Sequence, residues 1–322
     1  MKSWIGTVAL AMGALAVPVA VSGARAGEPA HYPVKTVTLV THSSVGGGSD
    51  VFLREMSKYL AKALGTNVIV ENTTGGSGAN AMARIAAAPK DGSIFYATTP
   101  TFIYTSLLST PAATYKDLEP VVNVFSDPEV IYTAANSPYK TLQDVIEHAK
   151  TARGTWGAAN PASLERQLLE RLKQASGVNA AVVTHEGGGD MMINVLNGTL
   201  DIGVGEVQEL TGQLEAKQVR LLATFTGDRL KAYPDLPTVK ETGFDVVGRK
   251  FRGIAGPKGL PADVIAAWEK AIPAVLADPE YKALYEAANL TPNFIPHAEY
   301  VTFIPDFAAE AERFLRGNGV IQ

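Results

Sequence analysis

TVTLVTHSSVGGGSD, residues 36–50, is the stretch that decides the fold. Its apolar run at 37–40 predicts a buried strand, and the apolar spacing over 51–64 predicts a helix. Between them lies a triple-glycine turn. A strand, a glycine turn and a helix start together present bare backbone N–H groups and the positive end of a helix dipole to a small anion. The stretch therefore predicts an α/β fold with an anion-binding turn.

The first 26 residues have the pattern of a secretory signal peptide. Lys2 gives a positive start, residues 4–21 are apolar and small, and Ala24-Arg25-Ala26 matches an A-x-A cleavage site. The alternative is a retained N-terminal anchor. Without Lys2 and Arg25 the net charge of −4 becomes −6. We therefore expect an exported, periplasmic protein whose acidic balance disfavours nucleic acid as a partner.

Strands and helices alternate along the rest of the chain. A second glycine-rich turn at 72–78 follows the predicted strand 67–71 and precedes a predicted helix at 79–88. Such alternation predicts βαβ units around a largely parallel sheet. Two extended segments, which span 117–134 and 251–255, predict two crossings between two lobes. The chain has no cysteine, so it forms no disulfide and has no thiolate chemistry.

The opening motif has an echo later in the chain. Residues 40–50 read VTHSSVGGGSD, and residues 183–190 read VTHEGGGD. Both have an apolar strand end, Thr-His, a triple glycine and an aspartate that opens a helix. Chance is the alternative explanation, since glycine is common. If the echo is real, two lobes each offer a backbone-amide turn and close on one another as a hinged clamshell.

The sequence does not match the common catalytic and nucleotide-binding motifs. The first glycine run lacks the lysine of a P-loop, and Gly75-Gly76-Ser77-Gly78 fails the dinucleotide-binding spacing. No G-x-S-x-G or HExxH occurs. A triad of Ser43 or Ser44, His42 and Asp50 would need neighbours on one turn to reach a geometry that they seldom reach. The pattern favours a binding protein.

Several polar residues have two interpretations each. Asp50 could complement the helix dipole or accept a hydrogen bond from a ligand amine, hydroxyl or water. Asp190 and Glu206 pose the same choice, with a structural role favoured for Glu206. His42 and His185 are either satisfied strand-end residues or cleft residues whose titration near neutral pH makes affinity depend on pH.

Several motifs resemble one known family. They are the run at 32–40, the turn at 46–50, Val68-Ile69-Val70-Glu71-Asn72 with 75–78, Pro89-Lys90-Asp91-Gly92, and the later segments 195–201, 234–239, 241–244 and 253–261. In this order they resemble the Bug (TctC-like) periplasmic substrate-binding proteins of tripartite tricarboxylate transporters. The resemblance covers essentially the whole chain after residue 31.

The resemblance implies a type II periplasmic-binding-protein fold, with two α/β lobes joined by two crossing strands. With the signal peptide at 1–26, we expect one lobe from 27–128 plus 252–322 and the other from 129–251. It implies a small mono- or dicarboxylate ligand, aliphatic or aromatic, a monomer, and transient contact with membrane permease subunits. A ligand-presenting sensor and a periplasmic enzyme on the same fold stay open as alternatives.

The resemblance also implies a set of ligand-contacting turns, at 43–47 with Asp50, 73–80, 158–163 and 186–190. No catalytic residue, metal ligand or cofactor is expected. The candidate ligand-binding residues are His42, Ser43, Ser44, Val45, Gly46, Gly47, Asp50, Thr73, Gly76, Ser77, Gly78, Ala79, Thr99, Ala159, Asn160, Ser163, His185, Glu186, Gly187, Gly188, Gly189, Asp190 and Glu206.

The chain departs from the family pattern within these turns. The family usually has proline and an aromatic residue where this chain has Thr41-His42, and an aromatic-Lys-Gly pattern where it has His185-Glu186-Gly187. Residues 158–163 replace a Gly-Ser-rich turn. These departures put the usual ligands in doubt. They suggest a ligand with polar groups beyond one carboxylate, or a histidine paired with a carboxylate.

Overall fold

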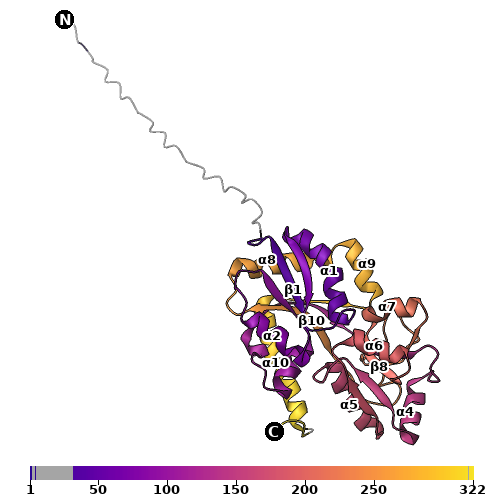
Figure 1. Ribbon diagram of the computed structural model, residues 1–322. Helices are drawn as coiled ribbons and strands as arrows, with labels where there is room; N and C mark the ends of the chain where they lie inside the picture. Colours follow the sequence, from indigo (N-terminus) through magenta and orange to yellow (C-terminus); the bar gives the residue numbers. More distant parts are fainter. Residues whose placement is uncertain (2–3, 5–31, 318) are drawn as a thin grey trace. The chain divides into compact units, whose positions relative to one another are not determined.

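Two β-sheets carry the fold of this protein (Figure 1). The computed structural model describes residues 1, 4, 32–317 and 319–322, and one unit extends from Tyr32 to the C-terminus. The expected signal peptide and its cleavage site lie outside the described residues. Within the described part of the chain, no helix combines the length and apolar character that crossing a bilayer requires.

The first sheet has six strands in the order β11-β4-β10-β3-β1-β2. Strands β1, β2 and β3 run parallel, while β10 pairs antiparallel with β3 and β4, and β11 pairs antiparallel with β4. The bounds are β1 Thr36–Thr41, β2 Asn67–Asn72, β3 Ile94–Thr98, β4 Leu118–Asp127, β10 Lys250–Pro257 and β11 Thr291–Ile295.

The second sheet has five strands in the order β7-β6-β8-β5-β9. Here β6, β7 and β8 are parallel, and β5 is antiparallel to β8 and β9. The bounds are β5 Glu129–Ala134, β6 Thr155–Ala158, β7 Ala181–Thr184, β8 Ile202–Glu206 and β9 Val219–Thr224. The lobe around the six-stranded sheet is called lobe 1 below, and the lobe around the five-stranded sheet lobe 2.

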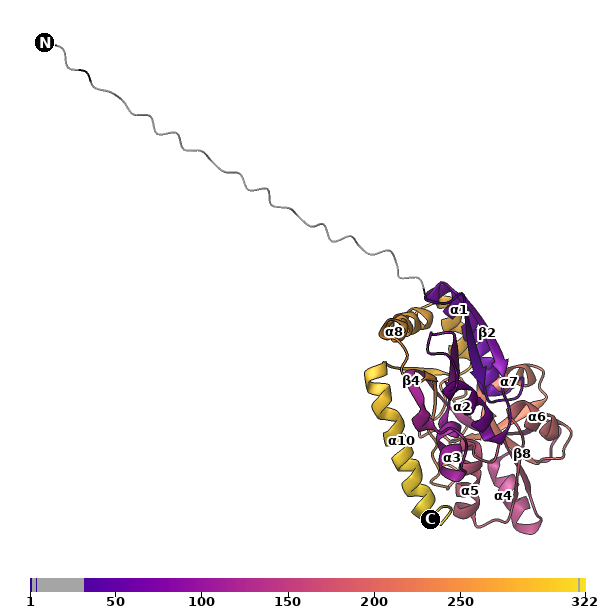
Figure 2. The ribbon, with the colours of Figure 1, turned by 60° about the vertical axis from the view of Figure 1, so that its left-hand side comes forward.

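Helices cover both faces of each sheet (Figures 1 and 2). Helices α1, α8 and α9 pack on one face of the first sheet, where Phe52 meets Phe125 edge-on at 6.0 Å between ring centroids. The bounds are α1 Gly48–Leu64, α2 Ala79–Ala86, α3 Pro100–Leu108, α4 Leu142–Thr151, α5 Leu164–Ser176, α6 Gly188–Leu196, α7 Val207–Glu215, α8 Ala262–Leu276, α9 Pro279–Ala287 and α10 His297–Gly317.

A continuous apolar core joins the two lobes on the side of α2, α3 and α10. Its centre is Phe251 of β10, whose ring lies edge-on to Phe102 of α3 and Tyr300 of α10. The same cluster continues into α4 and α5 of lobe 2. A separate cluster lies between the second sheet and helices α6 and α7. The lobes therefore share buried apolar surface next to the crossings.

Both expected crossings are present. Strand β4 ends at Asp127 in the first sheet, and β5 begins at Glu129 in the second, with only Pro128 between them. The return crossing enters β10 at Lys250, which is the register partner of Asp127. The predicted fold class, two α/β lobes joined by two crossing strands, is confirmed.

The sequence-based prediction left out three elements, α3, α7 and β11. Helix α3 begins with Pro100 after the N-cap Thr99, and it is buried on most sides. Its periodicity was weak because apolar residues lie on most of its sides and it has no charged face. Helix α7 has nine residues with a glycine inside, so it carries a short and interrupted pattern. Of the three elements, α7 has the greatest bearing on the site, because it carries Gln208 and Glu209.

Candidate functional site

The two triple-glycine turns meet across the boundary between the lobes. Helix α1 begins at Gly48 after one turn, and α6 begins at Gly188 after the other. A Cβ built on Gly189 would lie 2.3 Å from the backbone oxygen of Val45, and one on Gly187 would lie 2.7 Å from the backbone nitrogen of Ser44. Backbones can approach this closely only where side chains are absent. The two halves of the sequence echo therefore face each other.

The N–H groups of the first turn are already bonded within the protein. The Gly46 N–H donates to Asp50 Oδ2 at 3.0 Å, and the Gly47 N–H to the carbonyl of Ser44 at 3.1 Å. The Gly48 N–H donates to Glu209 Oε2 of lobe 2 at 2.8 Å. We expected these groups to be open to a ligand carboxylate. In this closed arrangement, a carboxylate of the protein itself holds the first N–H of α1.

Asp50 braces the first turn. Its carboxylate accepts hydrogen bonds from Gly46, from Arg54 Nε at 2.9 Å and from Asn72 Nδ2 at 2.9 Å, and the residue is 1% exposed. Burial alone would raise the pKa of Asp50, but the hydrogen bonds from Arg54, Gly46 and Asn72 outweigh it and hold the pKa below its ordinary value. All three donors belong to lobe 1, so Asp50 stabilises the turn from within that lobe.

We expect Asp50→Ala to lower the free energy of unfolding by about 1–3 kcal/mol, because the buried Asp50 carboxylate and its three hydrogen bonds are lost. Since the folded pKa is depressed, the stabilisation is fully present above the unfolded pKa and is lost as the pH falls through the folded pKa. Urea unfolding should give a constant difference from wild type above about pH 5 and a narrowing one below about pH 4.

Asp190→Ala provides the matched control for this experiment. Asp190 holds the corresponding position in the first turn of α6 but is exposed, so its removal should change stability by about 0.5 kcal/mol or less. Equal losses in the two variants would contradict the bracing role. Weakened solute binding by Asp50→Ala, beyond what lost stability explains, would support the prediction that Asp50 also contacts the ligand.

The two histidines of the echo are placed differently. The His42 ring is buried, and its Nδ1 lies 2.8 Å from the Tyr96 hydroxyl. Burial, with the nearby Lys250 ammonium, lowers the pKa of His42 to about 4. In this arrangement burial disfavours the charged form of His42 near neutral pH, which argues against His42 as the source of a pH-dependent affinity. His185 is half-buried, with Nε2 3.2 Å from Asn194 Nδ2.

A small polar cavity of about 20 Å³ lies between the lobes beside these turns. It is floored by β10 and closed by the starts of α1, α5 and α6. The sequence-predicted residues that line it are His42, Ser43, Thr99, Ala159, Asn160, Gly187, Gly188 and Glu206. Residues that line it without having been predicted are Gly48, Ser49, Thr101, Glu165, Glu209 and Lys250.

The other candidate residues lie elsewhere around the interlobe boundary. Gly76, Ser77 and Ala79 line a larger cleft of about 810 Å³, and Val45, Gly46 and Gly189 line a third of about 200 Å³. Ser163 caps α5, and Gly78 packs on His42 and Tyr96. Ser44 and Gly47 contact Gly187 and Gly188, Thr73 accepts a hydrogen bond from Arg84, and Glu186 and Asp190 are exposed.

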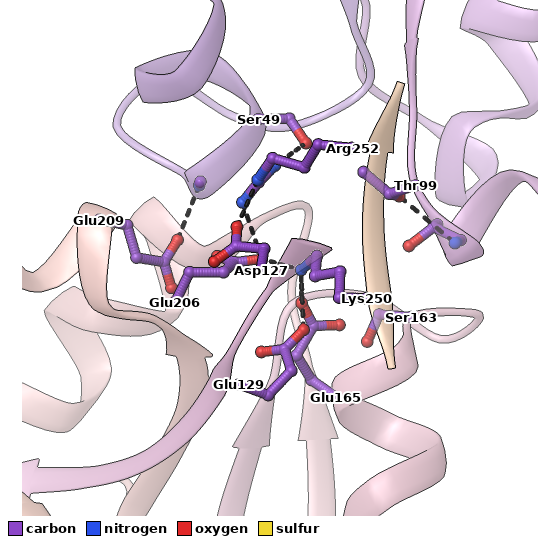
Figure 3. A network of polar contacts seen from close by, with 12 residues as sticks. Ser49, Thr99, Asp127, Glu129, Ser163, Glu165, Glu206, Glu209, Lys250 and Arg252 are labelled. Carbon is purple, nitrogen blue, oxygen red and sulfur yellow. Dashed lines mark hydrogen bonds and ion pairs between the residues drawn. The ribbon is translucent and has the colours of Figure 1, made fainter. Parts of the chain in front are cut away.

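A buried ion network joins both crossings beside the small cavity (Figure 3). Lys250 Nζ contacts Glu129 and Glu165, each at 2.8 Å, and also Glu206. All four side chains are at most 5% exposed. Glu129 opens β5, Lys250 opens β10, and Glu165 and Glu206 come from α5 and β8. The Lys250 ammonium thus ties the return crossing to lobe 2.

Arg252 makes the corresponding contacts toward lobe 1. Its guanidinium pairs with Asp127 at the end of β4, donates to Ser49 Oγ at 3.1 Å and lies 3.1 Å from Glu206 Oε1 (Figure 3). Ser49 belongs to lobe 1 and Glu206 to lobe 2. One fully buried side chain therefore contacts both lobes and a crossing strand.

Burial shapes the protonation of this network. It raises the pKa of Glu129 to about 8, helped by the nearby Glu165 carboxylate, and it raises the pKa of Glu209 well above its ordinary value. Burial would also raise the pKa of Glu165, but the Lys250 ammonium outweighs it, and the pKa of Glu165 lies below its ordinary value. Burial opposes the charge of Lys250, yet Glu129 and Glu165 raise its pKa.

The carboxylates around Lys250 have the spacing of a cation site. Oxygens of Glu129, Glu165 and Glu206 lie within 4.8 Å of one another. Lys250 Nζ contacts all three carboxylates, so an ammonium takes the position that a metal ion would need. The group is a salt-bridge cluster.

The network was missed at the sequence level, although two signals were present. Lys250 and Arg252 alternate with apolar residues at the start of a strand that is buried throughout. Asp127-Pro128-Glu129 sets two acids at the first crossing. Buried charges are rare unless they are paired, so a lysine and an arginine at the start of a buried strand indicate carboxylate partners.

The site has the chemistry of binding. His42 bonds the Tyr96 hydroxyl, and Asp50 bonds Arg54 and Asn72, so these two residues do not form a relay with Ser43 or Ser44. Opposed helix starts, hydroxyls and buried charges surround a polar cavity between two lobes. Together with the paired crossings, these features define a bilobal solute-binding protein.

The comparison with known families agrees with this class. The model of the tripartite tricarboxylate transporter family receptor, TctC, matches residues 52–320. The chain belongs to this family. Among curated relatives, a UPF0065 protein of Bordetella bronchiseptica is 28% identical over 269 residues, which are 83% of this chain and 78% of the relative.

Solved structures of similar shape show the same fold. The periplasmic binding protein BugD superposes with a TM-score of 0.82 at 23% identity, over 90% of this chain and 99% of its own. R. palustris Rpa4515 with adipate superposes with a TM-score of 0.83 at 22% identity, over 89% of this chain and 98% of its own. The predicted Bug (TctC-like) family membership is confirmed.

Proposed function

We propose that this protein captures a small organic acid by closing its two lobes and delivers it to a tripartite tricarboxylate-type membrane transporter. The observation that carries the proposal is the contact of Gly189 in lobe 2 with the Val45 carbonyl in lobe 1, beside a polar cavity. Glycine turns that meet through their backbones have no interlocking side chains, so they can separate when the lobes open and meet again when the lobes close. The family match supports the transporter role.

The carboxylate part of the proposal rests on the helix starts around the cavity and on one neighbour. Helices α1, α5 and α6 all begin there, and helix N-termini favour anions. The Rpa4515 structure holds adipate, a dicarboxylate. Mono- and dicarboxylates, aliphatic or aromatic, are the ligand classes to test first. The remaining sequence-predicted turn residues keep their candidate role within this proposal.

The moving parts proposed are residues 27–128 with 252–322 as one lobe and 129–251 as the other. The crossings at Pro128 and at Lys250–Arg252 would serve as the hinge, since they connect the two sheets. The protein would act in the periplasm as a monomer after removal of residues 1–26, and it would release its solute chemically unchanged.

Thermal denaturation with a panel of mono-, di- and tricarboxylates tests this function. A solute at 100 times its Kd adds about 2.7 kcal/mol of stability, which raises the melting temperature by several degrees. Small-angle X-ray scattering should then show a closed form with that solute, and mass spectrometry should recover it intact. Absence of any stabilising acid, or conversion of the acid, would overturn the proposal.

A further inference from the structure

A second and larger cleft lies between the lobes beside α3, α5 and α10. Helix α3 lies against both α5 and α10, and Figure 2 shows the three helices next to one another. The cleft has a volume of about 810 Å³ and shares no lining residue with the small polar cavity. Sites for small organic molecules have volumes of roughly 300–1,000 Å³. The cleft is therefore a separate compartment with the size of a ligand site.

An unpartnered amide faces this cleft. Gln167 of α5 lines the cleft, and the residue is 7% exposed. Among the described residues, no group forms a hydrogen bond with its side-chain oxygen or nitrogen. A buried polar group without a partner carries a free-energy penalty, which a bound polar group removes. Gln167 therefore points to an occupant with hydrogen-bonding atoms.

An unpaired guanidinium lies one helical turn further along α5. Arg171 stacks on the ring of Phe314 from α10, with 3.8 Å between the guanidinium carbon and the ring centroid, and its Nη1 donates to the Val247 carbonyl at 3.5 Å. Its Nε is buried and donates no hydrogen bond, and no carboxylate of the described residues pairs with it. A guanidinium presents its N–H groups as a planar fork that matches a carboxylate. Arg171 is thus held in position with donors left for an anion.

The charge of the cleft favours an anion. Among the described residues, the charged ones that line it are Arg166, Glu170 and Arg171. The Glu170 carboxylate already lies 3.0 Å from Lys173 Nζ and 3.9 Å from Arg166 Nε. Positive charge therefore exceeds negative charge here, although the chain as a whole has a net charge of −4.

Much of the remaining wall is apolar. Leu108 and Pro111 line the cleft from lobe 1 and Ala162 from lobe 2, and Phe314 and Val320 close it near the C-terminus. Apolar walls with a few convergent polar groups are typical of sites for small organic ligands. A charged head with an apolar body fits both parts of this lining.

We propose that this cleft is a second ligand site, which binds an organic acid with one carboxylate and an apolar body. The carboxylate binds Arg171 and Gln167. The body packs against Leu108 and Phe314. The site is distinct from the small polar cavity and does not depend on which solute that cavity takes. Because α3 belongs to lobe 1 and α5 to lobe 2, the occupant contacts both lobes and favours the closed arrangement. This acid acts as an effector of closure and not as the captured solute.

Two matched pairs of probes test the site. Octanoate and 1-octanol share an alkyl body, 2-naphthoate and 2-naphthol share an aromatic one, and only the acids are charged at pH 7. Calorimetry on the mature protein measures their binding, with butyrate as an acid that has a short body. We expect at least one of the two larger acids to bind at least tenfold more tightly than its alcohol and than butyrate. Failure of both larger acids to bind, or equal binding of the alcohols, would overturn the proposal.

Gln167→Leu replaces the amide by an apolar side chain of similar size. We expect affinity for the best acid to fall about tenfold or more, because a hydrogen bond to a carboxylate is lost. The ligand-free protein should melt about 1–3 °C higher, since an unpaired buried polar group is removed. A lower melting temperature would contradict the unpartnered state on which the proposal rests, and unchanged affinity would contradict the contact with the acid. Gln143→Leu, at an exposed position of α4, is the control and should leave affinity unchanged.

Arg171→Met removes the guanidinium and keeps an unbranched side chain that packs on Phe314. Affinity for the best acid should fall at least tenfold, whereas Arg153→Met, at an exposed position of lobe 2, should bind it like wild type. Unchanged affinity in Arg171→Met would overturn the site. Arg171→Met and Gln167→Leu should keep wild-type affinity for a small acid that the polar cavity takes up. Loss of both activities together would place the two acids in one site and would also overturn the proposal.

Small-angle X-ray scattering tests the effector role. The best acid alone should compact the protein, and it should no longer do so in Arg171→Met. Binding without compaction would overturn the effector role. Tighter binding of octyl phosphate than of octanoate would overturn the choice of a carboxylate head group.

Discussion

Replacement of Arg252 by methionine should lower the free energy of unfolding by about 3–5 kcal/mol, because removing one partner of a buried ion network leaves uncompensated charges behind. The guanidinium is fully buried and contacts Asp127, Ser49 and Glu206. Methionine fills similar space, so lost packing contributes little. Urea unfolding at pH 7 measures the difference.

Arg249→Met is the control for this experiment. Arg249 lies three residues earlier, and its ion pair with Glu310 is largely solvent-exposed. Exposed pairs contribute about 0–1 kcal/mol, so this variant should unfold close to wild type. Similar stability of the two variants would show that the Arg252 contacts do not hold the crossings together.

Replacement of Gly189 by alanine should block closure while sparing the fold. The added Cβ would lie 2.3 Å from the Val45 carbonyl oxygen of the other lobe and 3.3 Å from the Gly47 nitrogen. Both neighbours are backbone atoms, so the clash can be relieved only by moving the lobes apart. If closure is disfavoured by about 2.7 kcal/mol, solute affinity falls about a hundredfold.

Although Gly189→Ala should weaken solute binding, it should raise the free energy of unfolding of the solute-free protein. Alanine is a better helix former than glycine by up to about 1 kcal/mol, less in the first turn of a helix such as α6, and the open form has no clash to offset this gain. Small-angle scattering should show an expanded form that added solute no longer compacts. Calorimetry with the best solute found for wild type gives the affinity.

Gly212→Ala is the matched control for Gly189→Ala. Gly212 also lies inside a lobe 2 helix, α7, and a Cβ there would meet nothing within 4 Å. This variant should gain similar helix stability and keep wild-type affinity. Wild-type affinity in Gly189→Ala would mean that solute binds without the turn contact, which would contradict the closing mechanism.

Much of the architecture could be predicted from local pattern. The glycine turns, the strands before them and the helices after them depend on neighbouring residues, and their order predicted two lobes with two crossings. The echo between 40–50 and 183–190 predicted that the turns would face each other, which the Gly189 contact with Val45 shows. His42 and Ser43 reach the cavity because they directly follow Thr41, the last residue of β1, at the carboxyl edge of the sheet.

The partners within the charged network could not be predicted from local pattern. Lys250 meets Glu129 across a sequence separation of 121 residues, and Arg252 meets Ser49 across 203. The spacing of apolar residues along the chain does not indicate which distant residues pair. The role of Glu209 was also not predicted, because its helix α7 was not predicted. These contacts arise only when the two crossings are paired, so the site's charge emerged from the fold and not from any single motif.

The bond from the Gly48 N–H to Glu209 has a consequence for how the protein responds to scarce solute. A tethered carboxylate is present at high effective concentration whenever the lobes approach, whereas a solute must arrive by diffusion. Under the proposed function, closure brings the Glu209 carboxylate to the start of α1, and a solute carboxylate must displace this internal competitor to bind there. Ligands that bind the start of α1 more weakly than Glu209 does fail to displace it, so the bond sets a minimum affinity for capture.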